Sequence, residues 1–302
     1  MFEKPLLKFK TISEYHKYRE LSPPEHPLIS LVNFSDIQLR DNQSERFVFS
    51  FYSIALRRHS THDVFKYGQQ EYDHEEGIML FMAPDQVFEI DTNEKPQGWL
   101  LLIHPDLFWN TTLASTMKKY DFFEYAANEA LYLSPKEEEC MIALLGIIQK
   151  EYNANIDFYS HKIIIAQLEL LLSYSERYYN RQFVTRRISS HKIVTQLESF
   201  LNDYFESEKY IEKGIPSVQD VSLHLNISPK YLSDLLRSVT GKTTQQHIKY
   251  KLIETAKIKL STTSLSVSEI AYQLGFEQSQ SFSKLFKSKT NFTPVQFRKS
   301  FN

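Results

Sequence analysis

The sequence predicts an α+β chain: a small antiparallel β-barrel with packed helices, followed by an all-α region with two helix-turn-helix units. Three observations predict this architecture. Short segments rich in β-branched and aromatic residues fill the chain up to about residue 110. Beyond that point the apolar residues recur at helical spacing. Near the end of the chain one helical pattern occurs twice, with a period of about 50 residues.

Five strands are expected in the β-rich part, at residues 28–34, 47–56, 77–82, 87–91 and 99–103. Pro84-Asp85 and Glu94-Lys95-Pro96 predict turns between them. Short strands joined by turns favour a small antiparallel barrel or sandwich. Such a barrel either holds an apolar ligand or is filled by its own side chains. The alternation of residues marks six candidates for its lining: Phe49, Phe51, Ser53, Met79, Phe81 and Trp99.

The histidines of this part do not have the spacing of a metal site. The candidates are His59, His62, His74 and His104, with Glu71, Asp73, Glu75 and Glu76. His59 and His62 are three residues apart, which places them on opposite faces of a strand, and the sequence contains no His-x-His. The 7 glycines are too few to suggest Gly-rich nucleotide-binding loops. We therefore expect no metal, no cofactor and no catalytic residues, and the chain is not expected to be an enzyme.

Two helices are expected between the strands and the repeat. The first begins at Ser134-Pro135-Lys136-Glu137, a capping box with Pro at the first helical position. Its apolar residues follow at helical spacing: Met141, Ile142, Leu144, Leu145 and Ile148. The second helix runs from about Phe158 to Tyr179, and its apolar surface is too wide for one stripe. This helix packs on the barrel alone or also on the same helix of a second chain.

The predicted domains are residues 1–185, which are β-rich with helices at the C-terminal side, and residues 189–302, which are helical. The Arg-rich segment 181–187 predicts a linker between them. A helix over 190–208 then begins the second domain, with five apolar residues directed inward: Ile193, Leu197, Phe200, Leu201 and Tyr204. A later helix, containing Leu252, Ile253, Ala256 and Leu260, joins the two copies of the repeat.

The repeat predicts two helix-turn-helix units, which begin at Ser217 and Ser266. Each starts with a capping box, Ser217 with Asp220 and Ser266 with Glu269. Matching apolar residues follow, first Val218, Val221, Leu225, Leu232, Leu235 and Leu236, then Val267, Ile270, Leu274, Phe282, Leu285 and Phe286. Asn226 and Gly275 occupy the turns and tolerate a left-handed backbone. Ser228-Pro229 begins the second helix of the first copy.

Polar residues cover the opposite face of the second helix in each copy. Arg, Lys, Gln and Ser there can bond base edges or phosphates from a helix that lies in the major groove of DNA. The predicted DNA-binding residues are Lys230, Tyr231, Ser233, Asp234, Arg237, Gln278, Ser279, Gln280, Ser281, Ser283, Lys284 and Lys287. Any exposed helix carries such residues, but two copies with the same caps and the same sign of charge favour a pair of DNA readers.

The charge is distributed unevenly along the chain. Residues 217–302 hold 12 of the 35 basic and 5 of the 37 acidic residues, a balance of +7. The remaining residues have 23 basic and 32 acidic side chains, a balance of −9. A basic module on an acidic body attracts phosphate locally, and this argues against a helical repeat that binds a protein partner.

The C-terminal hundred or so residues resemble the DNA-binding domain of the AraC/XylS transcription regulators. The resemblance lies in Ser266, Ile270-Ala271, Leu274-Gly275-Phe276, Ser281-Phe282-Ser283, Leu285-Phe286-Lys287, Thr293-Pro294 and Phe297-Arg298. The first copy matches more loosely, through Leu232, Leu236, Gly241, Ile248 and Ala256-Lys257. Two positions depart from the family: Asn291 stands where Gly is usual, and Leu252 replaces a common Arg, with Lys251 beside it.

The resemblance implies a sequence-specific DNA-binding regulator whose N-terminal domain is a cupin-like sensor or dimerisation domain. The expected partners are double-stranded DNA and a second copy of the chain, with RNA polymerase and a small-molecule effector as further candidates. The alternative is a cupin-type enzyme or ligand-binding protein with an accessory helical domain. A single cysteine, Cys140, fits the cytoplasm, and the segment MFEKPLLKFK lacks the apolar core of a signal peptide.

Overall fold

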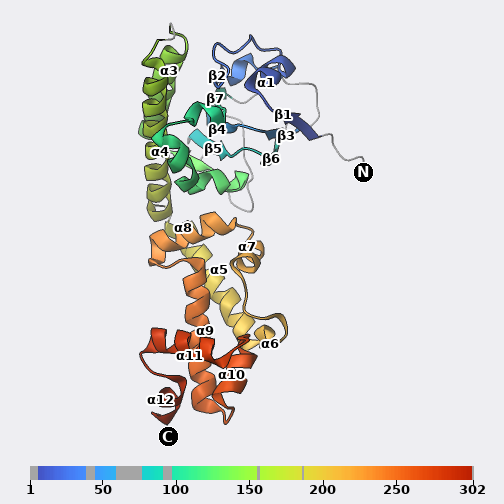
Figure 1. The fold of residues 1–302 in the computed structure, drawn as a ribbon, viewed down its shortest axis with the longest axis vertical. Helices are drawn as coiled ribbons and strands as arrows, with labels where there is room; N and C mark the ends of the chain where they lie inside the picture. Colours follow the sequence, from blue (N-terminus) through green and yellow to red (C-terminus); the bar gives the residue numbers. More distant parts are fainter. Residues whose placement is uncertain are drawn as a thin grey trace. The chain divides into compact units, whose positions relative to one another are not determined.

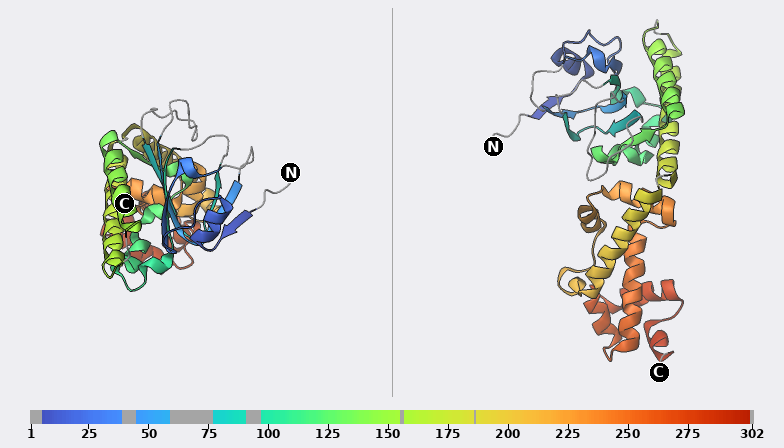
Figure 2. Two further views of the ribbon diagram at one scale, coloured as in Figure 1. Left: turned by 90° about the horizontal axis from the view of Figure 1, so that it is seen from above. Right: turned by 180° about the vertical axis from the view of Figure 1, so that it is seen from behind.

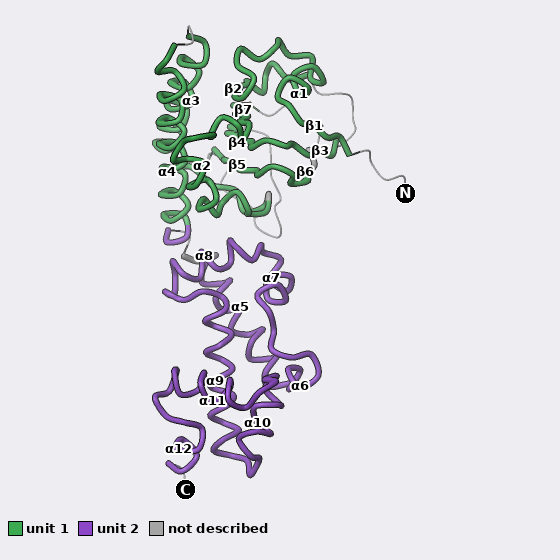
Figure 3. The backbone as a smooth tube through the Cα atoms, viewed as in Figure 1, with its two compact units in different colours: residues 1–182 green, residues 183–302 purple. Residues whose placement is uncertain are grey.

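The computed structural model divides into two compact units, residues 1–182 and 183–302 (Figure 3). The first unit is α+β and the second is helical, which confirms the predicted order of the two kinds of structure. The division falls within helix α4 (Ser160–Thr185), which therefore contributes its last turn to the second unit. The structure describes residues 6–38, 45–58, 77–90, 97–154, 157–185 and 187–300.

The first unit contains two β-sheets. The larger is antiparallel, in the order β2 (Ile29–Asn33), β7 (Gln97–Ile103), β4 (Tyr52–Arg58), β5 (Gly77–Met82) and β8 (Leu131–Leu133). The smaller has the order β1 (Leu6–Phe9), β3 (Glu45–Phe49) and β6 (Val87–Ile90), and β1 is parallel to β3. Four predicted strands appear as β2, β5, β6 and β7. The hydrogen bonds among the described strands do not show a closed barrel.

The predicted strand 47–56 is wrong in one respect, because it is two strands in different sheets. A bend at Ser50 and Phe51 separates β3 from β4. There the Ser50 amide donates to the Phe9 carbonyl at 2.9 Å, and the Asp85 amide donates to the Phe49 carbonyl at 2.7 Å. These long-range hydrogen bonds replace the strand ladder at a point where the sequence carries no turn signal.

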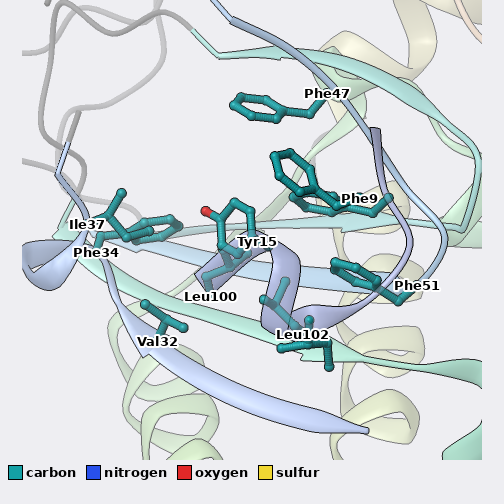
Figure 4. Packing of buried hydrophobic residues seen from close by; sticks show 11 residues of the cluster. Phe9, Tyr15, Val32, Phe34, Ile37, Phe47, Phe51, Leu100 and Leu102 are labelled. Atoms are coloured by element: carbon teal, nitrogen blue, oxygen red, sulfur yellow. The ribbon is translucent and has the colours of Figure 1, made fainter. Parts of the chain in front are cut away.

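An aromatic core fills the space beside the smaller sheet (Figure 4). The Phe49 and Phe51 rings stack with centroids 4.7 Å apart, and Phe9 meets Tyr15 edge to face at 5.7 Å. From β7, Leu100 and Leu102 join this cluster, as alternation along a strand requires. Five of the six candidate lining residues are buried and Trp99 is half-buried. The buried state of Phe49 and Phe51 in this cluster favours the alternative that they fill the core.

A buried ion pair lies at the edge of the aromatic core. Arg19 follows helix α1 (Ile12–Tyr18), and its side chain is 1% exposed. Its Nη2 donates to Glu45 Oε2 at 2.6 Å, and its guanidinium lies 5.1 Å from the centre of the Phe47 ring. The Tyr18 hydroxyl donates to the other oxygen of Glu45. Two elements that are distant in the sequence are therefore joined through one carboxylate.

Helices α3 (Pro135–Tyr152) and α4 lie on one side of the sheets (Figures 1 and 2). The Glu137 carboxylate accepts from the Ser134 amide at 2.9 Å, as the predicted capping box requires. The apolar residues predicted for α3 are buried, except Ile142, which is half-buried. The buried residues of α4 include Ile164, Ile165, Leu168, Leu171 and Leu172. Burial on all sides of α4 is not found within one chain, because Ile163 and Leu170 are 40% and 46% exposed.

Polar contacts join the C-terminal part of α4 to β8 and to α3. Gln182 accepts from the Tyr132 amide and donates to the Ala130 carbonyl. Arg181 pairs with Glu137 at 2.6 Å. Short helices connect the other elements of this unit: η1 (Phe34–Asp36), η2 (Pro105–Phe108), α2 (Thr112–Thr116), η3 (Met117–Lys119), η4 (Asp121–Glu124) and η5 (Ala127–Glu129).

The second unit is built on two long helices, α5 (Arg187–Glu206) and α9 (Thr244–Thr262). Where a linker was predicted, the backbone is helical on both sides of residue 186. Within this unit α7 and α8 gather at one end of α9 and α10 to α12 at the other (Figure 1). Leu197 and Leu201 of α5 are buried, and the other three predicted inward residues are half-buried. The remaining helices are α6 (Lys209–Lys213), α7 (Val218–Leu225), α8 (Pro229–Thr240), α10 (Val267–Gln273), α11 (Ser279–Thr290) and α12 (Pro294–Lys299).

Candidate nucleic-acid interface

The two predicted helix-turn-helix units are α7–α8 and α10–α11, and they begin in the same way. Ser217 Oγ accepts from the Asp220 amide at 3.1 Å, while the Asp220 carboxylate accepts from the Ser217 amide at 2.8 Å. Ser266 and Glu269 repeat this pair of bonds at 3.2 and 2.7 Å. The hydrogen bonds from each Ser lower the pKa of the paired carboxyl, and the bond from the hydroxyl has a larger effect than the bond from the amide. Both predicted capping boxes are confirmed.

The turns between the helices are also equivalent. Asn226 has φ 55° and ψ 44°, and Gly275 has φ 79°, so both adopt the predicted left-handed backbone. In each copy the next amide donates to a carbonyl of the preceding helix at 3.0 Å: Ile227 donates to Ser222, and Phe276 donates to Ala271. The first copy then starts its second helix at Ser228, whose Oγ accepts from the Tyr231 amide. In the second copy the corresponding position is Gln278, which makes no side-chain cap.

The structural repeat extends beyond the helices that were predicted to carry it. Thr240 and Thr290 each donate to the carbonyl four residues earlier, at 2.7 and 2.8 Å. The left-handed residues Gly241 (φ 73°) and Asn291 (φ 64°) follow. Asn291 thus performs the role for which Gly is usual in the resembling family. A further pair of capping boxes starts α9 at Thr243 with Gln246 and α12 at Thr293 with Gln296. The offset of 50 residues, continued past Thr290, would have revealed them.

The apolar faces of α8 and α11 point into the unit, so their polar faces point outward. Leu232 and Leu236 of α8 and Phe282 and Phe286 of α11 are all 0% exposed. Leu252, at the position of the family's common Arg, is 1% exposed and belongs to the core of α9. Its departure from the family is therefore a packing difference. Lys251 beside it donates to Asn202 of α5.

The predicted contact residues of α11 are the more accessible set. Five of the seven are exposed and two are half-buried: Gln278, Gln280, Ser281, Lys284 and Lys287, then Ser279 and Ser283. The side chains bring together amide, hydroxyl and ammonium groups over three turns of one helix. Such a face can donate hydrogen bonds to guanine or to phosphate, and its glutamine amides can both donate to adenine and accept from it.

The predicted contact residues of α8 are partly engaged within the second unit. Arg237 is exposed, and Lys230, Tyr231, Ser233 and Asp234 are half-buried. The Ser233 hydroxyl shares a hydrogen bond of 3.1 Å with Thr244. Asp234 lies 3.9 Å from Arg237, and the Tyr231 ring meets Phe183 edge to face at 5.1 Å. The sequence pattern places these residues on one helix face but contains no signal for those internal contacts.

A family model described as a helix-turn-helix domain matches residues 221–300. This range contains both predicted readers and the residues that carry the resemblance stated above. Residues 221–300 are an AraC-type helix-turn-helix domain. The AraC-type domain begins within α7 and ends after α12.

Known proteins show similarity over parts of the chain. An uncharacterized HTH-type transcriptional regulator in the cgkA 5' region of Pseudoalteromonas carrageenovora is 36% identical over 86 residues, 28% of this chain and 51% of that protein. The HTH-type transcriptional activator RhaR of Enterobacter sp. (strain 638) is 34% identical over 107 residues, 35% of this chain and 34% of that protein. The chain thus spans about half or less of the length of these relatives.

One solved structure matches a similar share of this chain. It is a transcriptional regulator of the class with AraC-type DNA-binding domains, from Chromobacterium violaceum, and it matches 38% of this chain and 96% of its own at 23% identity, with a TM-score of 0.33.

The candidate metal residues of the first unit fall mostly outside the structure. Seven of the eight lie in the segment 59–76, outside the described residues. His104 is described, and its Nδ1 accepts from the Asp106 amide at 3.3 Å. Within the described part of the chain no three His, Cys, Asp or Glu residues gather in a metal-binding group, and no helix is both long and apolar enough to cross a membrane.

Proposed function

We propose that this chain is a sequence-specific DNA-binding transcription regulator. The observation that carries the proposal is the outward polar face of α11 within an AraC-type domain, with the exposed Arg237 on the corresponding face of α8. The balance of +7 in residues 217–302 supplies the phosphate attraction that such a reader needs. The similar proteins RhaR and the cgkA-region regulator are described as transcriptional regulators, which is consistent with this role.

In the proposed mechanism, α8 and α11 enter successive segments of the major groove on one face of the duplex, about 34 Å apart. Arg237, Lys284 and Lys287 anchor phosphates or read guanine, and Gln278 and Gln280 pair with adenine edges. The function is divided as the sequence predicts, with DNA binding in residues 189–302 and sensing or dimerisation in residues 1–185.

The test is selection of duplexes from a random library by the full chain, followed by titration at two salt concentrations. We expect a motif that spans about two helical turns and an affinity that falls steeply as salt rises. Arg237→Ala or Lys284→Ala should each weaken binding to the selected duplex by about 10-fold, within the usual loss of 1–3 kcal/mol for a specific contact. Lys136→Ala in α3 removes one exposed positive charge from the first unit and should leave the affinity unchanged. If the full chain enriches no motif, the regulator proposal fails.

We also propose that the chain forms a homodimer through α4. Ile163, Ala166, Leu170 and Ser173 are exposed at spacings of three and four residues, which gives α4 an outer stripe of apolar and small side chains. A second copy of α4 would cover this stripe. Leu170→Glu should therefore shift the chain from dimer to monomer in sedimentation velocity. Val87→Glu, at an apolar position on β6 that is 52% exposed, should not. A monomeric wild-type chain would exclude the dimer.

Effector control by the first unit is a further part of the proposal. It rests on the strand-rich fold, the expected cupin-like character of this unit and the continuity of α4 into the second unit. RNA polymerase is a candidate partner because regulators of transcription act beside it. A panel of metabolites should contain at least one that shifts the melting temperature or the affinity for the selected duplex. The effector proposal fails if no metabolite in the panel does so.

A further inference from the structure

Lys259 is a basic residue of the AraC-type domain whose charge is turned inward. It lies near the end of α9, and its side chain is only 13% exposed. Its Nζ donates to Glu208 Oε1 at 2.8 Å and to Gln273 Oε1 at 3.1 Å. The same ammonium lies 5.7 Å from the centre of the Tyr210 ring. One side chain therefore connects α9 with α10 and with the turn between α5 and α6.

The acceptor Glu208 belongs to a turn with an uncommon backbone. Its φ of 53° and ψ of 22° are left-handed, a conformation that is costly for a residue with a β-carbon. The turn is held by a hydrogen bond from the Glu208 amide to the Phe205 carbonyl, and by Tyr210, which is 1% exposed and stacks on Phe205 at 5.3 Å. Hydrogen bonding to Lys259 lowers the pKa of Glu208, so the pair remains charged.

Leu260, the residue after Lys259 in α9, accepts a hydrogen bond from α12. Arg298 of α12 donates through Nε to the Leu260 carbonyl at 3.1 Å. The last turns of α9 thus hold α10 through Gln273 and α12 through Arg298. These two helices flank α11 in the chain. The first reader is attached elsewhere, since α7 packs on α5, and α8 packs on α5 and the start of α9.

We propose that Lys259 is a positioning residue that fixes the second helix-turn-helix unit against α5 and α6, and so sets the spacing and phase of α8 and α11 on DNA. This inference rests on the proposed DNA-binding function. A two-reader domain gains affinity only if both recognition helices meet their groove segments at once, so their mutual orientation decides which duplexes bind well. Lys259 acts through this orientation and does not touch DNA.

Lys259 can be distinguished from a phosphate contact by the salt dependence of binding. A Lys that neutralises a phosphate releases counterions, and its loss makes the dependence of log K on log salt less steep by about one unit. Lys259 is neutralised by Glu208 with or without DNA, so its loss should leave this slope unchanged. What should change is the preference for spacing, because an inserted base pair turns one groove segment by about 35° relative to the other.

The experiment uses the full chain and a duplex that the wild type selects from a random library. Binding is then measured on that duplex and on versions with one base pair inserted or removed between the two contacted segments. Lys259→Met should bind the selected duplex about 10-fold more weakly, the order of one lost base contact, with the wild-type salt slope and a flatter dependence on spacing. Lys259→Arg should recover part of the affinity. Glu208→Gln, at a carboxylate that is 55% exposed, should reproduce the flatter spacing dependence without removing a positive charge.

Lys257→Met is the matched control on the same helix. The Lys257 ammonium pairs with Glu254, three residues away in the same helix, at 2.7 Å, so the spacing preference of this variant should match that of the wild type. A Lys259→Met chain with the wild-type spacing preference, or with a less steep salt slope, would overturn the positioning role. If the wild-type chain itself selects no duplex, the DNA-binding proposal fails first. That result differs from one in which the wild type selects a duplex and Lys259→Met binds it normally.

Discussion

Phe282→Ala is expected to lower the free energy of unfolding of the second unit by about 3–5 kcal/mol, the usual cost of truncating a buried Phe. Phe282 is 0% exposed, lies on the inner face of α11, and packs against Phe276 and Phe286 at 5.4 and 5.7 Å. The cavity would loosen the packing of α11 on α10. DNA affinity should fall with stability, because the polar face of α11 is held outward by this packing.

The two units can be followed separately in this experiment. The only tryptophans, Trp99 and Trp109, both belong to the first unit, so their fluorescence reports on that unit alone. Urea unfolding of Phe282→Ala should show an earlier loss of helical circular dichroism and an unchanged tryptophan transition. Phe292→Ala, at a position 54% exposed, should change stability by no more than about 0.5 kcal/mol. Equal losses in the two variants would contradict the assigned core.

Arg19→Met should destabilise the first unit by about 3–5 kcal/mol, because it leaves the Glu45 carboxylate without its cation in a buried site. The side chains of the pair are 1% and 10% exposed, so water cannot replace the lost guanidinium. Met preserves much of the volume and isolates the effect of charge. The variant should show an earlier tryptophan transition, while the helical signal of the second unit remains.

Arg58→Met provides the matched comparison within the same unit. Arg58 also pairs with a glutamate, Glu138, but its side chain is 56% exposed, so the expected loss is at most about 1 kcal/mol. Arg19→Met combined with Glu45→Met should recover part of the stability, although the Tyr18 hydroxyl then loses one acceptor. A double variant as unstable as Arg19→Met alone would show that shape, and not the uncompensated charge, determines the cost.

The predictions that the structure confirms depend on interactions between residues close in the sequence. The capping boxes at Ser217 and Ser266 join residues three apart, and the turns at Asn226 and Gly275 depend on the backbone preference of one residue. A sequence contains all of this information. The twelve predicted contact residues were grouped in the same way, by their spacing along two helices, and their role in DNA binding remains a prediction.

Other features depend on residues far apart, and no local pattern marks them. The bend at Ser50 exists because Phe9 and Asp85 supply its hydrogen bonds, and β8 forms where residues 131–133 meet β5. Arg19 appears in the sequence as one more basic residue after a short helix. Only the fold brings Glu45 and the Phe47 ring to it.

The sequence by itself determined the helical repeat, its caps and turns, and the outward polar face of α11, because helix periodicity and capping act over a few residues. The tertiary structure decided which of the charged side chains remain free to meet a partner. Lys259 and Lys284 are both lysines of the AraC-type domain, yet one is enclosed by α6, α9 and α10 and the other is exposed. The difference arises because an ion pair such as that of Lys259 needs a carboxylate 51 residues away, and folding alone brings the two groups within 2.8 Å.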